Sequence, residues 1–193
     1  MNIFGLDITG EIGAMTAALA AVGAGIFGLN QYSKAERWKR AEFTIAQIRL
    51  LSEDATLAFC CRAIDWGAGP LIIPMKYREL FPAGQVIVQH SWLLMANSLR
   101  PSLHSDFLNE QIAAQFLLYR YAFDDFFSYL DALVMYRDLS VIRESDLGPI
   151  KYYLAQVKDP RYWDNDSLGG DQVFGDFVES FYHERVWPWL KTH

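Results

Sequence analysis

The sequence has few of the residues that build cross-linked, metal-held or linker-rich proteins. Only two of its 193 residues are cysteines, and these are the adjacent Cys60 and Cys61. A disulfide framework and a four-ligand zinc site are therefore excluded, and a reducing compartment is favoured. Thirteen glycines and seven prolines are too few for a collagen-like or linker-rich chain, and 15% aromatic residues argue against disorder. The length suits one domain, or one domain with an anchor.

Positive charge is scarce, and it is absent from the first part of the chain. Seventeen Lys and Arg residues against 23 Asp and Glu residues give a net charge of −6, which argues against a general nucleic-acid binder. No Lys or Arg occurs before Lys34, and the 22 residues between Glu11 and Lys34 carry no charge. We therefore expect no nucleic-acid partner, and the uncharged stretch becomes the first feature to explain.

The uncharged stretch predicts a transmembrane helix. Its apolar part, residues 12–29, has 18 residues, or about 27 Å of helix, close to the roughly 30 Å of a bilayer's hydrocarbon core. The predicted division is an extracytoplasmic segment 1–11, a membrane helix 12–31 and a helical domain 32–193. The alternative is a buried, Ala-rich helix of a soluble bundle, but such a helix normally has a polar stripe, and this one has none.

The residues after the stretch predict the orientation of the chain in the membrane. Basic residues stay on the cytoplasmic side, and Trp and Tyr favour the interface. The predicted membrane-interface residues are Tyr32, Lys34, Arg37, Trp38, Lys39 and Arg40. Because no basic residue precedes the stretch, we expect a retained anchor rather than a cleaved signal peptide. The N-terminus is expected outside and the bulk of the chain in the cytoplasm, at a bacterial inner membrane.

Small residues form a four-residue row in this stretch, namely Gly13, Ala17, Ala21 and Gly25. Such rows let two helices approach closely in a membrane. They predict a helix–helix contact with a protein partner or with another copy of the chain. Lipid alone around the helix remains the alternative, because small residues are frequent throughout the stretch.

The same segment contains a Gly-x-Gly-x-x-Gly spacing at Gly23, Gly25 and Gly28. In dinucleotide-binding proteins this turn follows a β-strand and precedes a helix, with an acidic residue about twenty positions further on. Here the preceding residues are Ala-rich, and the first suitable acid, Glu53, lies 25 residues past Gly28. We therefore expect no dinucleotide cofactor.

The rest of the chain predicts an all-α fold. No Gly or Pro interrupts the chain between Leu29 and Trp66, so the membrane helix is expected to continue as a stalk to about residue 51. An irregular stretch is expected over residues 66–82. Apolar spacing, caps and breakers predict further helices at 52–65, 86–99, 106–139, 146–157 and 171–187. The expected architecture is a membrane helix, a stalk and a cytoplasmic helical bundle.

No motif in the chain predicts a metal or another cofactor. None of the four histidines stands in a His-Glu-x-x-His or Glu-x-x-His motif. Asp164 and Asp166 begin like a calcium loop, but Leu168 and Gly175 occupy positions where the loop needs acids. Glu179 and His183, four residues apart, are the basis of an alternative function, a membrane-tethered enzyme or effector whose site is assembled from scattered residues.

Aromatic residues are concentrated near the C-terminus. Most are expected in the core, but Tyr and Trp are also enriched at protein interfaces. Tyr182, Trp187 and Trp189 are therefore predicted as a protein-binding face.

Two segments resemble a family of uncharacterised bacterial single-pass membrane proteins that share a domain of unknown function. The segments are AERWKRAEF at 35–43, which follows the anchor, and AIDW at 63–66. The resemblance implies bacterial origin and membrane anchoring, and it implies no catalytic residue. We expect a non-enzymatic scaffold, regulator or accessory subunit of a membrane complex.

Overall fold

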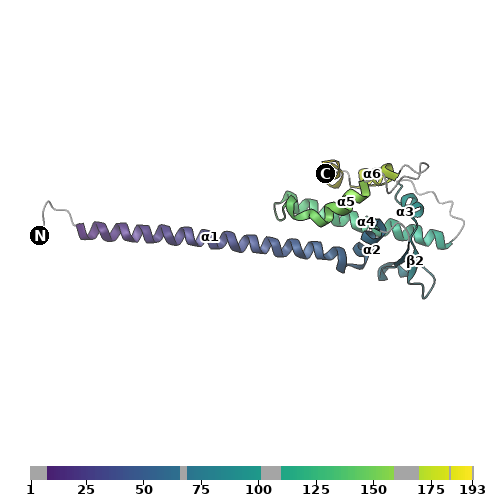
Figure 1. Cartoon of the computed structure of the whole chain (residues 1–193), viewed down its shortest axis with the longest axis horizontal. Coiled ribbons are helices and arrows are strands. Elements are labelled where there is room, and N and C mark those ends of the chain that lie inside the picture. Colours follow the sequence, from purple (N-terminus) through teal and green to yellow (C-terminus); the bar gives the residue numbers. More distant parts are fainter. Residues whose placement is uncertain (1–7, 66–68, 101–109, 159–169, 183, 193) are drawn as a thin grey trace. The chain divides into compact units, whose positions relative to one another are not determined.

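The structure is a computed structural model that describes residues 8–65, 69–100, 110–158, 170–182 and 184–192. Most of this part of the chain is helical, which confirms the all-α class (Figure 1). The helices are α1 (Ile8–Glu53), α2 (Ala55–Asp65), α3 (Trp92–Ser98), α4 (Glu110–Asp138), α5 (Gly148–Lys158), α6 (Gly170–Phe181) and α7 (Val186–Thr192). Two 3-10 helices, η1 (Met75–Leu80) and η2 (Glu144–Leu147), and two short strands, β1 (Pro70–Ile72) and β2 (Ile87–Gln89), complete the described elements.

The contacts of the chain divide it into two compact units, 1–43 and 44–193. We call these the N-terminal unit and the C-terminal unit. The sequence predicts a different boundary, between a membrane helix that ends at residue 31 and a cytoplasmic domain that begins at residue 32. That boundary stays a prediction. Helix α1 supplies residues to both units, and the predicted continuous helix through residue 51 is confirmed, since α1 ends at Glu53.

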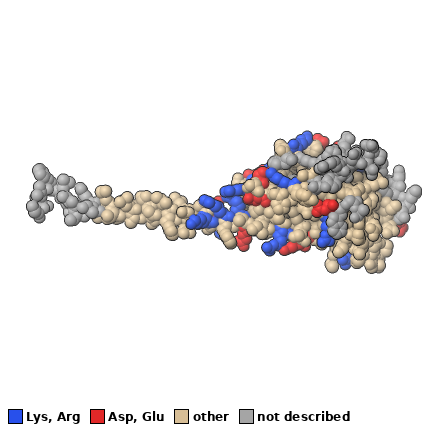
Figure 2. Space-filling model, in the orientation of Figure 1, with Lys and Arg blue, Asp and Glu red and all other residues tan. Residues whose placement is uncertain are grey.

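The described part of the N-terminal unit is residues 8–43 of α1. Its large apolar side chains are exposed, and on the face drawn in Figure 2 no charged atom lies on the first described part of the helix. Basic side chains follow from Lys34 onward. Among the residues that the structure describes, no helix is both long and apolar enough to cross a membrane.

The C-terminal unit begins with the last ten residues of α1. Thr44 and Leu51 are buried there, and the Tyr129 hydroxyl donates a hydrogen bond of 2.8 Å to the Gln47 carbonyl. Asp54 then starts α2, because its Oδ1 accepts hydrogen bonds of 2.9 Å from the backbone N–H groups of Thr56 and Leu57. This N-cap confirms the predicted start of the second helix.

Helix α4 forms the centre of the C-terminal unit, and α2, α3, α7 and η1 contact it. Five aromatic rings meet around it, with centroids 5.6–6.3 Å apart: Phe123, Phe126, Phe127, Phe177 and Tyr182. The apolar face predicted for residues 106–139 is buried from Phe116 onward, whereas Ile112 is exposed. Residues 106–109 lie outside the described part of the chain.

The prediction of one helix over residues 86–99 is wrong in its first part. Residues 87–89 form β2, which pairs antiparallel with β1 so that Leu71 faces Val88 and Ile72 faces Ile87. Three consecutive β-branched residues favour a strand here, at Val86, Ile87 and Val88. Helix α3 begins only after Ser91, whose Oγ accepts from the Leu94 N–H at 3.3 Å. The stretch 66–82, predicted as irregular, contains β1 and η1.

The predicted last helix, 171–187, is also wrong in extent. It is divided into α6, which ends at Phe181, and α7, which begins at Val186. Pro188 lies in the first turn of α7 and does not end it, because the first turn needs no N–H donor from that residue. The helix predicted at 146–157 is α5, which begins two residues later at Gly148 with Pro149 in its first turn, while Asp146 lies in the preceding η2.

Candidate functional site

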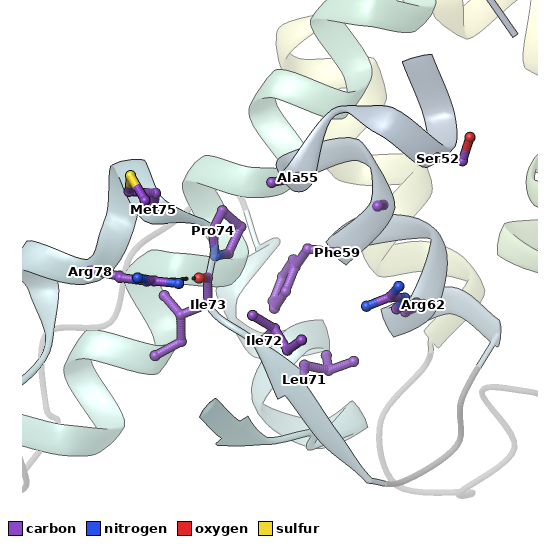
Figure 3. A pocket seen from close by; sticks show the side chains of 11 residues that line it. Ser52, Ala55, Phe59, Arg62, Leu71, Ile72, Ile73, Pro74, Met75 and Arg78 are labelled. Carbon is purple, nitrogen blue, oxygen red and sulfur yellow. Dashed lines mark hydrogen bonds between the residues drawn. The ribbon is translucent and has the colours of Figure 1, made fainter. Parts of the chain in front are cut away.

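The candidate site is a pocket in the C-terminal unit between α2 and the segment that joins β1 to η1 (Figure 3). It has a volume of about 340 Å³, which is at the small end of ligand pockets. Phe59 reaches from α2 toward Leu71 and Ile72 (Figure 3). Phe59, Leu71 and Ile73 are buried, so they give the pocket an apolar floor.

The hairpin positions the apolar wall of the pocket. Side chains alternate between the two faces of a strand, which places Leu71 inward and leaves Ile72 exposed. The Ile73 N–H donates to the Val86 carbonyl at 2.9 Å and extends the pairing by one bond. Pro74 follows and starts η1, which brings Met75 and Arg78 to the pocket.

Among the residues that the structure describes, two arginines are the only charged ones that line the pocket. Arg62 comes from α2 and is exposed, and Arg78 comes from η1 and is half-buried. In Figure 3 their side chains lie on either side of Phe59. The Arg78 Nε donates to the Ile73 carbonyl at 3.4 Å. Within the described chain no carboxylate forms an ion pair with either arginine, so the pocket has an excess of positive charge.

The outer edge of the pocket is apolar as well. Ile72 is 56% exposed and Met75 is 76% exposed. Ile87 pairs with Ile72 across the hairpin, and both it and Val86 are exposed. We call Ile72, Met75, Val86 and Ile87 the hairpin face. Covering large apolar side chains of this kind with another apolar surface lowers the free energy of the system.

A polar cluster lies beneath η1, where the Asp125 carboxylate of α4 accepts hydrogen bonds from Lys76 and from the Tyr77 hydroxyl. Burial, together with the hydrogen bond to Asp125, raises the pKa of Tyr77.

Burial also raises the pKa of the Cys60 thiol well above its ordinary value, and that of Cys61 to about 12. Both thiols are therefore protonated and poor nucleophiles, and both belong to the buried core.

His90 is buried in a second polar cluster. Its Nδ1 lies 2.7 Å from the Tyr119 hydroxyl, which also accepts from the Ser91 N–H at 3.2 Å. Its Nε2 is buried without a hydrogen-bond partner among the described residues. Burial lowers the pKa of His90 to about 4, so the ring is neutral at pH 7. No group of three or more potential metal-binding side chains occurs among the described residues.

The predicted helix–helix residues all lie on α1 in the N-terminal unit and do not contribute to the pocket. Ala17 and Ala21 are exposed, and a Cβ added at Gly13 or Gly25 would meet nothing within 4 Å. The row is therefore open to another helix. Of the predicted interface residues, Arg40 is half-buried and forms a 3.5 Å ion pair with Glu36. The others are exposed, namely Tyr32, Lys34, Arg37, Trp38 and Lys39.

The three C-terminal aromatic residues pack on the C-terminal unit. Trp189 is only 2% exposed and its Nε1 donates to Glu144 at 3.3 Å. The Tyr182 hydroxyl donates to Asp124 at 2.7 Å. Trp187 is half-buried, with the Lys191 ammonium 4.5 Å from its ring centroid. That these residues form a protein-binding face stays a prediction. Trp189 is too buried to contribute much surface to such a face.

The structure adds no support for the two alternatives in which the chain carries out chemistry or binds calcium. Glu179 is exposed on α6, and His183 lies outside the described residues. The calcium-like segment with Asp164, Asp166 and Leu168 also lies outside them.

Comparison of the chain with protein-family models, with curated proteins and with solved structures finds no match.

The pocket is a feature that the sequence reasoning missed, since its wall comes from residues predicted as irregular or helical. The alternation in Pro70–Ile72 and Ile87–Gln89, with Leu71 and Val88 inside, is the signal that could have shown it.

Proposed function

We propose that the uncharged stretch of α1 anchors this protein in a bacterial inner membrane as a single-pass protein. We further propose that the protein acts there through contacts with protein partners, as a scaffold, regulator or accessory subunit of a membrane complex. The resemblance of residues 35–43 and 63–66 to uncharacterised single-pass membrane proteins agrees with this proposal.

The observation that carries the proposal is the exposure of apolar side chains on α1. Six large apolar residues between residues 15 and 29 are 59–71% exposed: Met15, Leu19, Val22, Ile26, Phe27 and Leu29. Fully burying one such side chain is worth about 1.5–3 kcal/mol, so leaving six in water costs on the order of 10 kcal/mol. Ile12 and Ala14 belong to the same uncharged stretch, and their side chains lie outside the described residues.

The flanking charges support the orientation with the N-terminus outside. Residues 34–49 contain five basic and two acidic residues, a net charge of +3, directly after the uncharged stretch. Basic residues close to a membrane helix remain on the cytoplasmic side, and each contributes about 1 kcal/mol near anionic headgroups. The C-terminal unit is therefore proposed to lie in the cytoplasm.

Orientation is testable by labelling single added cysteines from outside the cell, because the two native cysteines are buried. The cysteine introduced by Ile3→Cys should react with a membrane-impermeant maleimide in intact spheroplasts. A cysteine at Ser145→Cys, an exposed position of the C-terminal unit, should react only after lysis. The reverse pattern would contradict the proposed orientation.

The open row Gly13, Ala17, Ala21 and Gly25 supports a role through helix contacts. Helices in lipid associate by close packing rather than by hydrophobicity, so small residues mark a contact surface. Gly25→Ile fills this surface and keeps the stretch apolar, so membrane insertion should persist while the complex is lost. The measurement is the size of the complex on native gels and the set of co-purifying proteins in mild detergent.

The matched control is Leu19→Ile, which changes a large side chain outside the row and keeps its volume. It should leave the complex unchanged. If Gly25→Ile has no more effect than Leu19→Ile, the row makes no essential contact, and the stalk and the C-terminal aromatic residues would have to carry the partner contacts.

A further inference from the structure

We infer that the pocket between α2 and η1 binds an anionic phospholipid, with the phosphate held by Arg62 and Arg78 and part of an acyl chain on the apolar floor. This site lies in the C-terminal unit and goes beyond the proposed anchor. None of the residues proposed for helix–helix contact on α1 lines this pocket.

The arginines carry the headgroup part of the inference. A guanidinium matches the oxygens of a phosphate with paired hydrogen bonds and stays charged at any physiological pH. Arg62 and Arg78 line one pocket from two different elements, and neither has an acidic partner among the described residues. No Asp or Glu of the described part of the chain lines the pocket, so an anion there meets two positive charges and no described carboxylate.

The lining carries the acyl-chain part. Apart from the arginines and Ser52, every lining residue is apolar: Ala55, Ala58, Phe59, Leu71, Ile72, Ile73, Pro74 and Met75. A small polar anion such as free phosphate would leave this surface wet. An acyl chain attached to the phosphate would cover it and gain the hydrophobic free energy.

The exposed hairpin face favours a lipid over a peptide. Ile72 and Met75 belong both to the pocket and to the hairpin face, so the apolar surface continues outward past the pocket. Exposed apolar residues beside basic ones are typical of surfaces that rest on anionic membranes. A peptide that added to the sheet would find only a three-residue strand on either side.

The test is retention of single-chain lipids by the full-length protein in neutral detergent, counted by native mass spectrometry. Lysophosphatidylglycerol and lysophosphatidylcholine of the same chain length form the matched pair, because both carry the phosphate and only the second adds a compensating cation. The protein should retain one lysophosphatidylglycerol roughly tenfold more tightly than lysophosphatidylcholine. Arg62→Gln and Arg78→Gln should each weaken this retention by roughly tenfold, as expected for a lost charge-assisted hydrogen bond.

Two further variants separate the pocket from other lipid-binding surfaces. Ala58→Leu fills the pocket and keeps a good helix former in α2, so it should also abolish selective retention. Arg49→Gln removes a positive charge from α1 outside the pocket lining and should change nothing. Since neither Arg62 nor Arg78 is buried, the arginine variants decide the question even if Ala58→Leu does not fold.

Equal retention of the two lipids, or retention that the arginine variants do not reduce, would overturn the inference, because lipid would then bind elsewhere. Competition by inorganic phosphate at the lipid's own concentration would also overturn it, since the acyl chain would then add nothing. These outcomes are independent of whether α1 spans the membrane, which extraction of membranes tests separately.

Discussion

At the scale of single residues, His90 shows how burial sets the charge of a side chain. The Nδ1 atom of the ring lies beside the Tyr119 hydroxyl, and its Nε2 atom is buried without a hydrogen-bond partner among the described residues. Its pKa is lowered to about 4, whereas an unfolded His titrates near 6.5. The unfolded chain therefore binds a proton at this position at a higher pH than the folded chain does.

This difference predicts a pH dependence of stability. Since the unfolded state takes up the proton first, the stability that neutral His90 provides is present above pH 6.5 and is lost as the pH falls toward 4. Between pH 7 and pH 5 the loss should be about 1–2 kcal/mol. The measurement is urea unfolding of the C-terminal unit within the full chain at both pH values. In His90→Gln the glutamine does not titrate, so this variant should lose less stability over the same interval, and an equal loss would contradict the assignment.

Individual side chains were predicted well where a local rule decides their role. A helix was predicted to start directly after the stalk, and Asp54 caps α2 at that boundary. The partners of the polar side chains were not predictable, because they come from distant parts of the chain. Asp124 lies one helical turn from Arg120, but its carboxylate accepts a hydrogen bond from Tyr182, 58 residues further on.

At the scale of elements, the Asp54 cap predicts a measurable loss. Asp54→Ala leaves the Thr56 and Leu57 N–H groups without an acceptor, so the free energy of unfolding should fall by about 1 kcal/mol. Asp54→Asn keeps an oxygen at the same place and is the matched control, with an expected loss of a few tenths of a kcal/mol. Urea unfolding followed by circular dichroism measures both, and equal losses in the two variants would argue against the cap.

The aromatic cluster predicts a larger effect on α4. Phe127 is fully buried against Phe123, Phe126 and Phe177, so Phe127→Ala removes transfer free energy and leaves a cavity. The expected cost is about 3–5 kcal/mol. Met135→Ala, at an exposed position of the same helix, should cost less than about 1 kcal/mol. Thermal unfolding of both variants checks the difference, and similar melting temperatures would contradict the central role of α4.

Long helices were predictable because their patterns repeat, whereas the hairpin was not. Helices α1 and α4 have many consecutive residues without Gly or Pro, and both were predicted with their ends within a few residues of the observed ones. Strands of three residues give too short a pattern to separate from a helix. The pocket depends on β1, β2 and η1, and it was missed because the alternation around Leu71 and Val88 extends over three residues in each strand.

At the scale of the whole molecule, the two units have different surfaces. The C-terminal unit has its own buried core around α4. The described N-terminal unit is a helix whose apolar side chains are exposed. A stretch this rich in Ala and Gly is weakly hydrophobic for a membrane helix, so one added charge should be enough to prevent insertion. On insertion scales a charged residue at the centre of a membrane helix costs about 2.5–3.5 kcal/mol.

The central claim, that α1 anchors the chain in a membrane, is tested most directly by alkaline carbonate extraction of membranes that carry the full-length protein. The native chain should stay in the membrane pellet, and so should Ser33→Asp, which adds a charge after the predicted membrane helix 12–31. Ala20→Asp, which adds the same charge within that helix, should move the protein into the supernatant. Recovery of the native chain in the supernatant would contradict the claim, and α1 would then have to be covered by protein rather than by lipid.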